Sequence, residues 1–167
     1  QVANAFAADG FPVNAFSRSN TASEPKVRLF TEASGADQFA AFMKATRVLM
    51  ILAPLTTATQ DRFDRKALQL LPRGAYVINV ARGGLIVDEA LLELLDNGHL
   101  NGAALDVFRQ EPLPPQHRYW THPKVHMTPH TAAVTPMRPA AKQIAEKIKQ
   151  HAANRSVSGI VDRNRGY

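Results

Sequence analysis

The sequence predicts an α/β fold with a doubly wound, mostly parallel sheet. Short runs of β-branched and other apolar residues, such as 47–53 and 76–80, alternate along the chain with segments of helical periodicity. The links between them are short, and the strongest runs have the length and composition of strands buried in a parallel sheet. Alternation of this kind places parallel strands in a sheet with helices packed on its faces.

The run 76–80 is the central predicted strand, and Ala81, Arg82 and two glycines follow it. Glycine permits a tight turn and close approach by another group, so the strand is expected to end there. Asp88 has the side chain of a helix N-cap, and the next helix is expected over 89–96. Arg82 therefore lies just past the carboxyl end of a strand, at the edge where α/β sheets bind ligands.

Upstream of this strand, glycine and proline mark the ends of the expected elements. A helix ends at Gly10, another at 35–45 carries its aromatic residues on one side, and a third at 64–71 ends at Pro72. Strands are expected at 11–16, 27–30 and 47–53, with a polar loop at 21–26.

Downstream, small residues at 102–107 indicate a closely packed strand, and a proline-rich loop at 109–123 leads to the last strand at 124–128. Pro136 begins a long helix that runs to about residue 151, because proline fits the first turn of a helix. Ile144 and Ile148 lie four residues apart and so share one face of that helix.

Composition excludes several classes of function. The 167 residues contain no cysteine, which excludes disulfides, thiolate catalysis and cysteine-based metal sites. No apolar run reaches the roughly 20 residues that span a bilayer, and we recognise no signal peptide, so we expect a cytoplasmic protein without membrane contact. The formal charge of +6 permits nucleic-acid binding, but the basic residues are scattered, and a bias toward small anions explains the charge as well as a polynucleotide would. We expect a small-molecule partner and no nucleic acid.

Polar residues follow the predicted strands at the edge where ligands bind. They are Ser17 to Ser19, residues 54–59, Arg82, Asp106 and residues 128–130. If the strands are parallel, these residues line one cleft built from loops on a rigid sheet.

Arg18, flanked by Ser17 and Ser19, suits a phosphate group. A guanidinium offers paired donors, and the hydroxyls add further donors. In dinucleotide-binding folds an acidic residue at this place holds a ribose diol, whereas arginine accommodates a 2′-phosphate. No acidic residue occupies 17–20, and a solvated loop arginine is the alternative interpretation.

His130 is the candidate acid–base residue, because an imidazole exchanges protons near neutral pH. Glu111 could orient it and favour its protonated form by charge. Taken alone, each has an ordinary alternative as a solvated loop residue, and His122 and His126 compete in the same region. The histidines form no helical pair with a nearby acid, so no metal site is expected.

Three ordered motifs occur at 79–88 (NVARGGLIVD), 104–112 (ALDVFRQEP) and 128–132 (TPHTA). Together they resemble the D-2-hydroxyacid dehydrogenases, whose nucleotide-binding domain is a Rossmann-type fold. The loop 113–123 and the ending 161–167 resemble the glyoxylate/hydroxypyruvate reductase branch. The resemblance covers the whole chain and implies an oxidoreductase that reduces a small 2-keto acid with NADPH, with NAD as the other cofactor to consider.

The resemblance also implies roles for individual residues. Arg82 would bind the substrate carboxylate and keto oxygen, His130 would donate the proton, and Glu111 would keep His130 protonated. Trp120 would shape the substrate pocket, although a loop-anchoring aromatic residue is an equal alternative. The implied cofactor-binding residues are Ser17, Arg18, Ser19, Leu52, Pro54, Thr59, Val80, Ala81 and Asp106.

The family's glycine-rich G-x-G-x-x-G turn does not occur in this sequence. We therefore expect 1–167 to form an incomplete dinucleotide-binding domain that lacks its first strand, so that the strands at 12–16 and 48–53 expose apolar edges. The helix and tail at 136–167 are expected to pack on an absent substrate domain, and the full-length parent is expected to be a homodimer. The alternative function is a non-catalytic dinucleotide-binding or interaction fragment.

Overall fold

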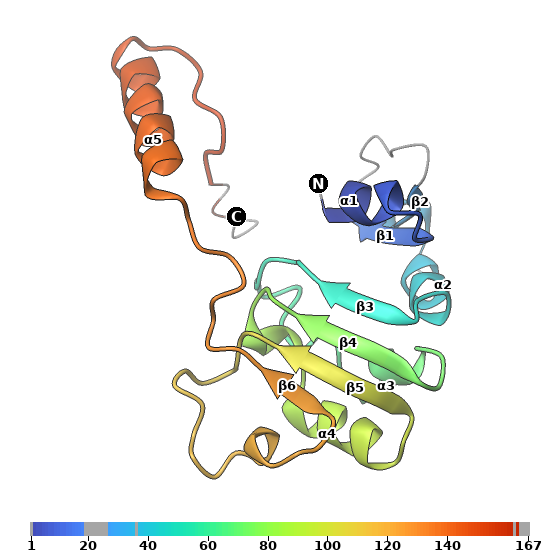
Figure 1. Ribbon diagram of the computed structural model, residues 1–167. Helices are drawn as coiled ribbons and strands as arrows, with labels where there is room; N and C mark the ends of the chain where they lie inside the picture. The colour runs from blue at the N-terminus through green and yellow to red at the C-terminus, as the bar shows by residue number, and fades with distance from the viewer. Residues whose placement is uncertain (1, 19–26, 36, 162, 164–167) are drawn as a thin grey trace.

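The computed structural model describes residues 2–18, 27–35, 37–161 and 163, and its strands form two parallel sheets (Figure 1). One sheet pairs β1 (Val13–Ser17) with β2 (Val27–Thr31). The other has the order β3-β4-β5-β6, from β3 (Val48–Ile51), β4 (Ala75–Asn79), β5 (Leu100–Leu105) and β6 (Val125–Met127). Every pairing between these strands is parallel, which confirms the predicted α/β class.

The helices follow one another along the chain in the predicted order. They are α1 (Val2–Ala8), α2 (Gln38–Lys44), α3 (Arg65–Gln69), α4 (Asp88–Asp96) and α5 (Met137–Ala152), with short 3₁₀ turns at Glu32–Ser34, Gly83–Leu85 and Arg118–Trp120. The polar loop predicted at 21–26 lies outside the described residues.

The prediction that Asp88 caps α4 is wrong. Val87 occupies the cap position without a side-chain cap bond, and Asp88 is the first residue of the helix. The Asp88 carboxylate has a different partner, because its Oδ1 accepts a hydrogen bond of 3.0 Å from the hydroxyl of Tyr119. The Asp88 side chain therefore connects α4 to the proline-rich loop and does not cap the helix.

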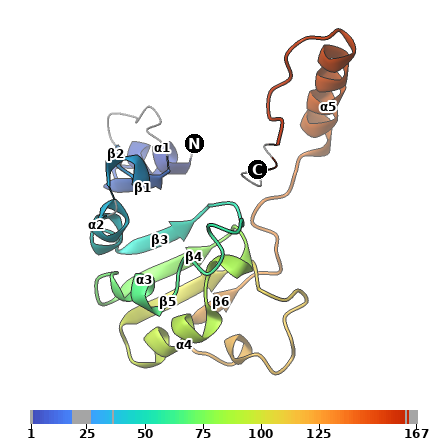
Figure 2. The ribbon, with the colours of Figure 1, turned by 180° about the vertical axis from the view of Figure 1, so that it is seen from behind.

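The main core lies between α3, α4 and one face of the four-stranded sheet (Figures 1 and 2). Leu91, Leu94 and Leu95 of α4 are fully buried, as the three- and four-residue spacing of an amphipathic helix requires. They join one cluster with Leu49 of β3 and Val77 of β4, which point to the same side of the sheet. This packing fixes the sheet whose strand ends carry the candidate site.

The two-stranded sheet joins the same core through α2. Phe16 of β1 lies 5.3 Å from Phe39 and 5.6 Å from Phe42 between ring centroids, and Phe30 of β2 lies 5.8 Å from Phe42. β1 and β3 are not paired with each other, and Val48 and Leu52 are 54% and 53% exposed. β3 thus presents the open apolar edge expected from the sequence.

Helix α5 projects from the sheets in both views (Figures 1 and 2). None of its residues is buried, and Ile144 and Ile148 are exposed on it. None of the described helices is both long enough and apolar enough to cross a bilayer.

Among the glycines that the structure describes, Gly83 has the least room for a side chain, which supports a prediction about stability. A Cβ added at Gly83 would lie 1.9 Å from the backbone carbon of Phe108, whereas one at Gly84 would meet the Leu55 side chain at 3.1 Å. We expect Gly83→Ala to lower the free energy of unfolding by about 3 kcal/mol or more, because a backbone must move. Gly84→Ala is the matched control and should cost less than about 1 kcal/mol, since the exposed Leu55 can turn aside. Equal effects in urea denaturation would contradict this contact.

Candidate active site

His130 and Glu111 form a hydrogen-bonded pair at the carboxyl edge of the four-stranded sheet. Nδ1 of His130 lies 2.7 Å from Oε2 of Glu111, and the two side chains are 50% and 38% exposed. The other carboxylate oxygen, Oε1, accepts a 2.9 Å hydrogen bond from the backbone N–H of Phe108. Glu111 is therefore held by its own loop while it orients the imidazole, and Nε2 of His130 makes no hydrogen bond within the described part of the chain.

The pKa of Glu111 lies below its ordinary value, which shows that its surroundings favour the carboxylate. The hydrogen bond with His130 has the largest effect on this pKa, and the bond from the Phe108 N–H comes next. The charges of His130 and Arg82 lower it further, while burial opposes them. Arg82, Glu111 and His130 lie on the loops that follow β4, β5 and β6, and because these strands are parallel the three loops start from the same edge of the sheet.

Arg82 is held by the turn that follows β4. The buried side chain of Asn79 accepts a 3.1 Å hydrogen bond from the Ala81 N–H and donates one of 3.0 Å to the Arg82 carbonyl. The Arg82 guanidinium donates to the Ala81 carbonyl at 2.6 Å and stays exposed. The sequence alone led us to assign no role to Asn79. The signal that could have pointed to this role is an amide side chain at the end of an apolar strand.

Asp106 is buried at the end of β5 and holds the loop that carries His130. Oδ1 accepts hydrogen bonds from the Thr128 hydroxyl and, at 2.8 Å, from the Thr131 N–H, and Oδ2 accepts one of 2.9 Å from the Ala132 N–H. His130 has φ +56°, in the left-handed region that favours glycine, so its backbone needs this support. The contact of Asp106 with a cofactor stays a prediction.

The pKa of Asp106 lies below its ordinary value. Burial alone would raise this pKa, but the hydrogen bonds from Thr128, Ala132 and Thr131, together with the charge of His130, outweigh burial. Asp106 is thus a buried carboxylate whose negative charge is compensated by the loop that it supports.

The remaining predicted cofactor residues lie on strand ends, and their contact with a cofactor stays a prediction. Leu52 and Pro54 follow β3 and are exposed. Thr59 closes the loop 54–59 on itself, since its Oγ1 donates to the Pro54 carbonyl at 2.7 Å and accepts from the Thr56 N–H at 2.8 Å.

The predicted cofactor residues at the ends of β4 and β1 differ in exposure. Val80 and Ala81 follow β4, where Ala81 is buried. Ser17 ends β1, Arg18 follows it as an exposed residue, and Ser19 lies outside the described residues.

Trp120 ends the 3₁₀ turn Arg118–Trp120 and is exposed. Its Nε1 donates a 3.0 Å hydrogen bond to the Pro114 carbonyl, so the indole links two parts of the proline-rich loop. This contact matches the loop-anchoring alternative, and the role of Trp120 in a substrate pocket stays a prediction.

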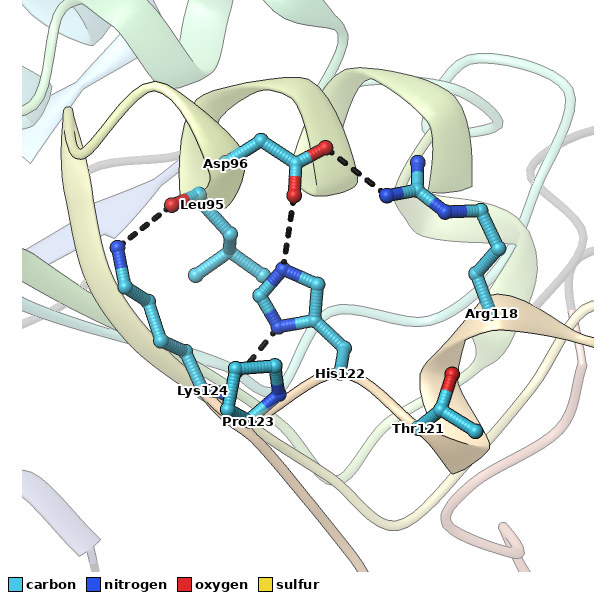
Figure 3. A pocket seen from close by; sticks show the side chains of 7 residues that line it. All are labelled: Leu95, Asp96, Arg118, Thr121, His122, Pro123 and Lys124. Atoms are coloured by element: carbon cyan, nitrogen blue, oxygen red, sulfur yellow. Dashed lines mark hydrogen bonds and ion pairs between the residues drawn. The ribbon is translucent and has the colours of Figure 1, made fainter.

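His122 belongs to a second polar cluster, which lies at the carboxyl end of α4 (Figure 3). Asp96 bridges Arg118 Nη2 at 3.0 Å and His122 Nε2 at 3.2 Å, and His122 Nδ1 accepts from the Lys124 N–H at 3.1 Å. The side chain of His122 is only 6% exposed. His122 therefore fastens the proline-rich loop to α4, and the described residues contain no cluster of histidines and acids that could hold a metal ion.

Comparison with known proteins identifies the family. Residues 1–132 match the family model described as D-isomer specific 2-hydroxyacid dehydrogenase, NAD binding domain. The chain belongs to this family. The motifs at 79–88, 104–112 and 128–132 predicted it correctly.

Curated relatives and solved structures resemble the chain over nearly all of its length. A glyoxylate/hydroxypyruvate reductase A from Salmonella choleraesuis is 46% identical over 100% of this chain and 52% of its own length, so the chain spans about half of that relative. A D-isomer specific 2-hydroxyacid dehydrogenase from Xanthobacter autotrophicus Py2, in complex with NADPH and MES, has a TM-score of 0.93 at 38% identity, covering 99% of this chain and 66% of that one. An NADPH-dependent glyoxylate/hydroxypyruvate reductase from Sinorhizobium meliloti, in complex with NADP and sulfate, has a TM-score of 0.90 at 35% identity, covering 99% and 52%.

The variant Asp106→Asn tests whether the hydrogen-bonded Asp106 carboxylate makes stability depend on pH. Because the pKa of Asp106 lies below its ordinary value of 3.8, its carboxylate stabilises the fold at higher pH, and this contribution is lost as pH falls through that range. The free energy of unfolding should thus drop more in the wild type than in Asp106→Asn between about pH 6 and about pH 3. At about pH 6 the variant should be less stable by about 1–3 kcal/mol, because a buried N–H loses its acceptor. The exposed Asp9→Asn is the control, and equal pH slopes in urea denaturation would refute the assignment.

Proposed function

We propose that this chain is the nucleotide-binding half of an NADPH-dependent reductase that converts a small 2-keto acid, such as glyoxylate or hydroxypyruvate, to the D-2-hydroxy acid. The observation that carries the proposal is the 2.7 Å pair of His130 and Glu111, at the sheet edge from which the Arg82 loop also starts. The named activity of relatives about twice its length, and the NADP and NADPH bound in similar structures, support it.

The three side chains supply what reduction of a ketone requires. Negative charge develops on the keto oxygen, so a cation and a proton donor must face that atom. The Arg82 guanidinium binds the substrate carboxylate and the keto oxygen, and His130 gives the proton from Nε2, because Nδ1 is engaged by Glu111. Glu111 remains a carboxylate and balances the imidazolium charge; in the reverse direction His130 accepts the proton.

The donor set after β1 fits the cofactor. NADPH, when bound, supplies the hydride to the carbonyl carbon. Arg18 is exposed and follows Ser17 in the sequence, and a guanidinium and a hydroxyl are both donors that suit the 2′-phosphate. We assign the remaining cofactor contacts, by family resemblance, to Ser19, Leu52, Pro54, Thr59, Val80, Ala81 and Asp106, with NAD as the weaker alternative cofactor.

The same proposal includes the assembly and its location. We propose a homodimer in the cytoplasm that does not bind nucleic acid, with the segment 136–167 packed on a second domain. The exposed Ile144 and Ile148 on α5 support that packing, because a helix face of this kind is stabilised when it is covered.

His130→Ala and Arg82→Ala test the catalytic assignment in the complete gene product that carries this chain. We expect kcat for NADPH oxidation with glyoxylate to fall about 10²–10⁴-fold in His130→Ala, because the proton donor is lost. Arg82→Ala should raise KM for the keto acid and lower kcat. His126→Ala, at an exposed histidine of β6, is the matched control and should keep wild-type rates. Wild-type protein that binds NADPH but reduces no 2-keto acid would instead favour the non-catalytic binding module.

Arg18→Ala tests the choice of cofactor separately. Loss of a charge-assisted phosphate contact of about 1.5–3 kcal/mol should weaken NADPH binding by about tenfold to a hundredfold and leave NADH binding unchanged. Fluorescence titration with both dinucleotides measures this. Arg73→Ala, at another exposed arginine, is the control. An unchanged preference for NADPH over NADH would refute the 2′-phosphate assignment.

A further inference from the structure

The Arg109 guanidinium connects three loops at the carboxyl edge of the sheet. Its Nε donates to the Ile86 carbonyl at 2.8 Å, and its Nη2 donates to the same carbonyl and to Oδ1 of Asp61. Nε also lies 3.8 Å from Oδ1 of Asp88 at the start of α4. The side chain is 33% exposed, so about two-thirds of its surface is covered by these loops.

Each connected loop carries a residue of the proposed site. Asp61 follows the loop that contains Thr59, and Ile86 ends the turn that begins at Arg82. Arg109 itself lies two residues before Glu111, whose carboxylate holds His130. A single side chain therefore joins the loop of Glu111 to the segments that bear the proposed cation and a proposed cofactor contact.

Backbone contacts bring these loops close together. The Asp61 N–H donates to the Gly84 carbonyl at 2.9 Å, and the Phe63 N–H donates to the Leu85 carbonyl at 3.0 Å. Phe108 packs its backbone against Gly83. Arg109 adds an ionic contact between the loop that contains Phe108 and the segment that contains Asp61.

Asp61 occupies a backbone position that favours glycine. Its φ of +56° lies in the left-handed region, which is unfavourable for most side chains and best tolerated by glycine, asparagine and aspartate. Glycine would serve the turn at least as well, so the turn alone does not account for a carboxylate there. Its contact with the Arg109 guanidinium gives the carboxylate a function.

We propose that Arg109, paired with Asp61, is a positioning residue that fixes the Arg82 turn relative to the Glu111–His130 pair. Arg109 acts through the Ile86 carbonyl and its own loop and does not touch the substrate. The inference rests on the proposed reductase function. Its physical basis is that a reacting group displaced by about 1 Å can cost about 10²-fold in rate.

The test compares Arg109→Met, Arg109→Lys, Asp61→Asn and the double variant Arg109→Met/Asp61→Asn in the complete gene product. Asparagine keeps the left-handed turn and removes only the charge. We expect kcat with glyoxylate to fall about tenfold to a hundredfold in Arg109→Met and several-fold in Asp61→Asn, with KM for NADPH changed less than about threefold. Lysine should restore part of kcat, and the double variant should be no slower than Arg109→Met, because both changes remove one interaction.

Arg65→Met is the matched control. Arg65 makes a 2.8 Å ion pair with Glu93 between α3 and α4, so its removal breaks a comparable pair that joins no site loop. Its kcat should stay within about twofold of the wild type.

Three kinetic outcomes would overturn the positioning role. They are wild-type kcat in both Arg109→Met and Asp61→Asn, additive losses in the double variant, and an equal loss in Arg65→Met. A crystal structure of Arg109→Met gives a readout that does not depend on turnover: we expect the Arg82 turn to be displaced from Glu111, and an unmoved turn would also refute the role. If the wild type reduces no 2-keto acid, the proposed function fails, and the crystal structure alone then decides the structural part of the inference.

Discussion

The parallel alignment of β3 to β6 is the constraint on which the rest of the structure depends. Parallel strands all end at the same edge, so the segments that leave β4, β5 and β6 begin close together although they are far apart in the sequence. The buried leucines of α4 and the strand residues they cover hold this sheet in place. The loops that carry Arg82, Glu111 and His130 all start from that rigid edge, and there Glu111 and His130 are in contact.

The two carboxylates at this edge, Asp106 and Glu111, have different roles. Asp106 is buried, and its oxygens accept hydrogen bonds from backbone N–H groups and a hydroxyl of the loop 128–132. It thereby determines the position of the backbone that carries His130. Glu111 is accessible and faces the imidazole itself. Both have a pKa below the ordinary value, but in Asp106 hydrogen bonds must overcome burial, whereas in Glu111 the partner histidine has the largest effect. One carboxylate supports the loop and the other orients the ring.

The fold was predictable from the sequence because apolar periodicity and chain-breaking residues report local structure directly. The proximity of His130 and Glu111 was also predictable, since both follow strands that a parallel sheet places side by side. The contact between Arg109 and Asp61 was not, because it joins residues 48 positions apart through loop conformations that periodicity does not describe. Asp88 was misassigned for a similar reason: its cap signal is local, whereas its partner Tyr119 comes from a distant loop.

The half-exposed setting of His130 and Glu111 has a consequence for the strength of their interaction. Two charges 4 Å apart interact by about 1 kcal/mol in bulk water and by about 4 kcal/mol at an effective dielectric constant of 20. A layer that excludes water from this edge would therefore multiply the influence of these charges on a bound carbonyl without moving any of them. In the proposed reductase, the effect of these side chains on the substrate would depend on the exclusion of water as much as on their geometry.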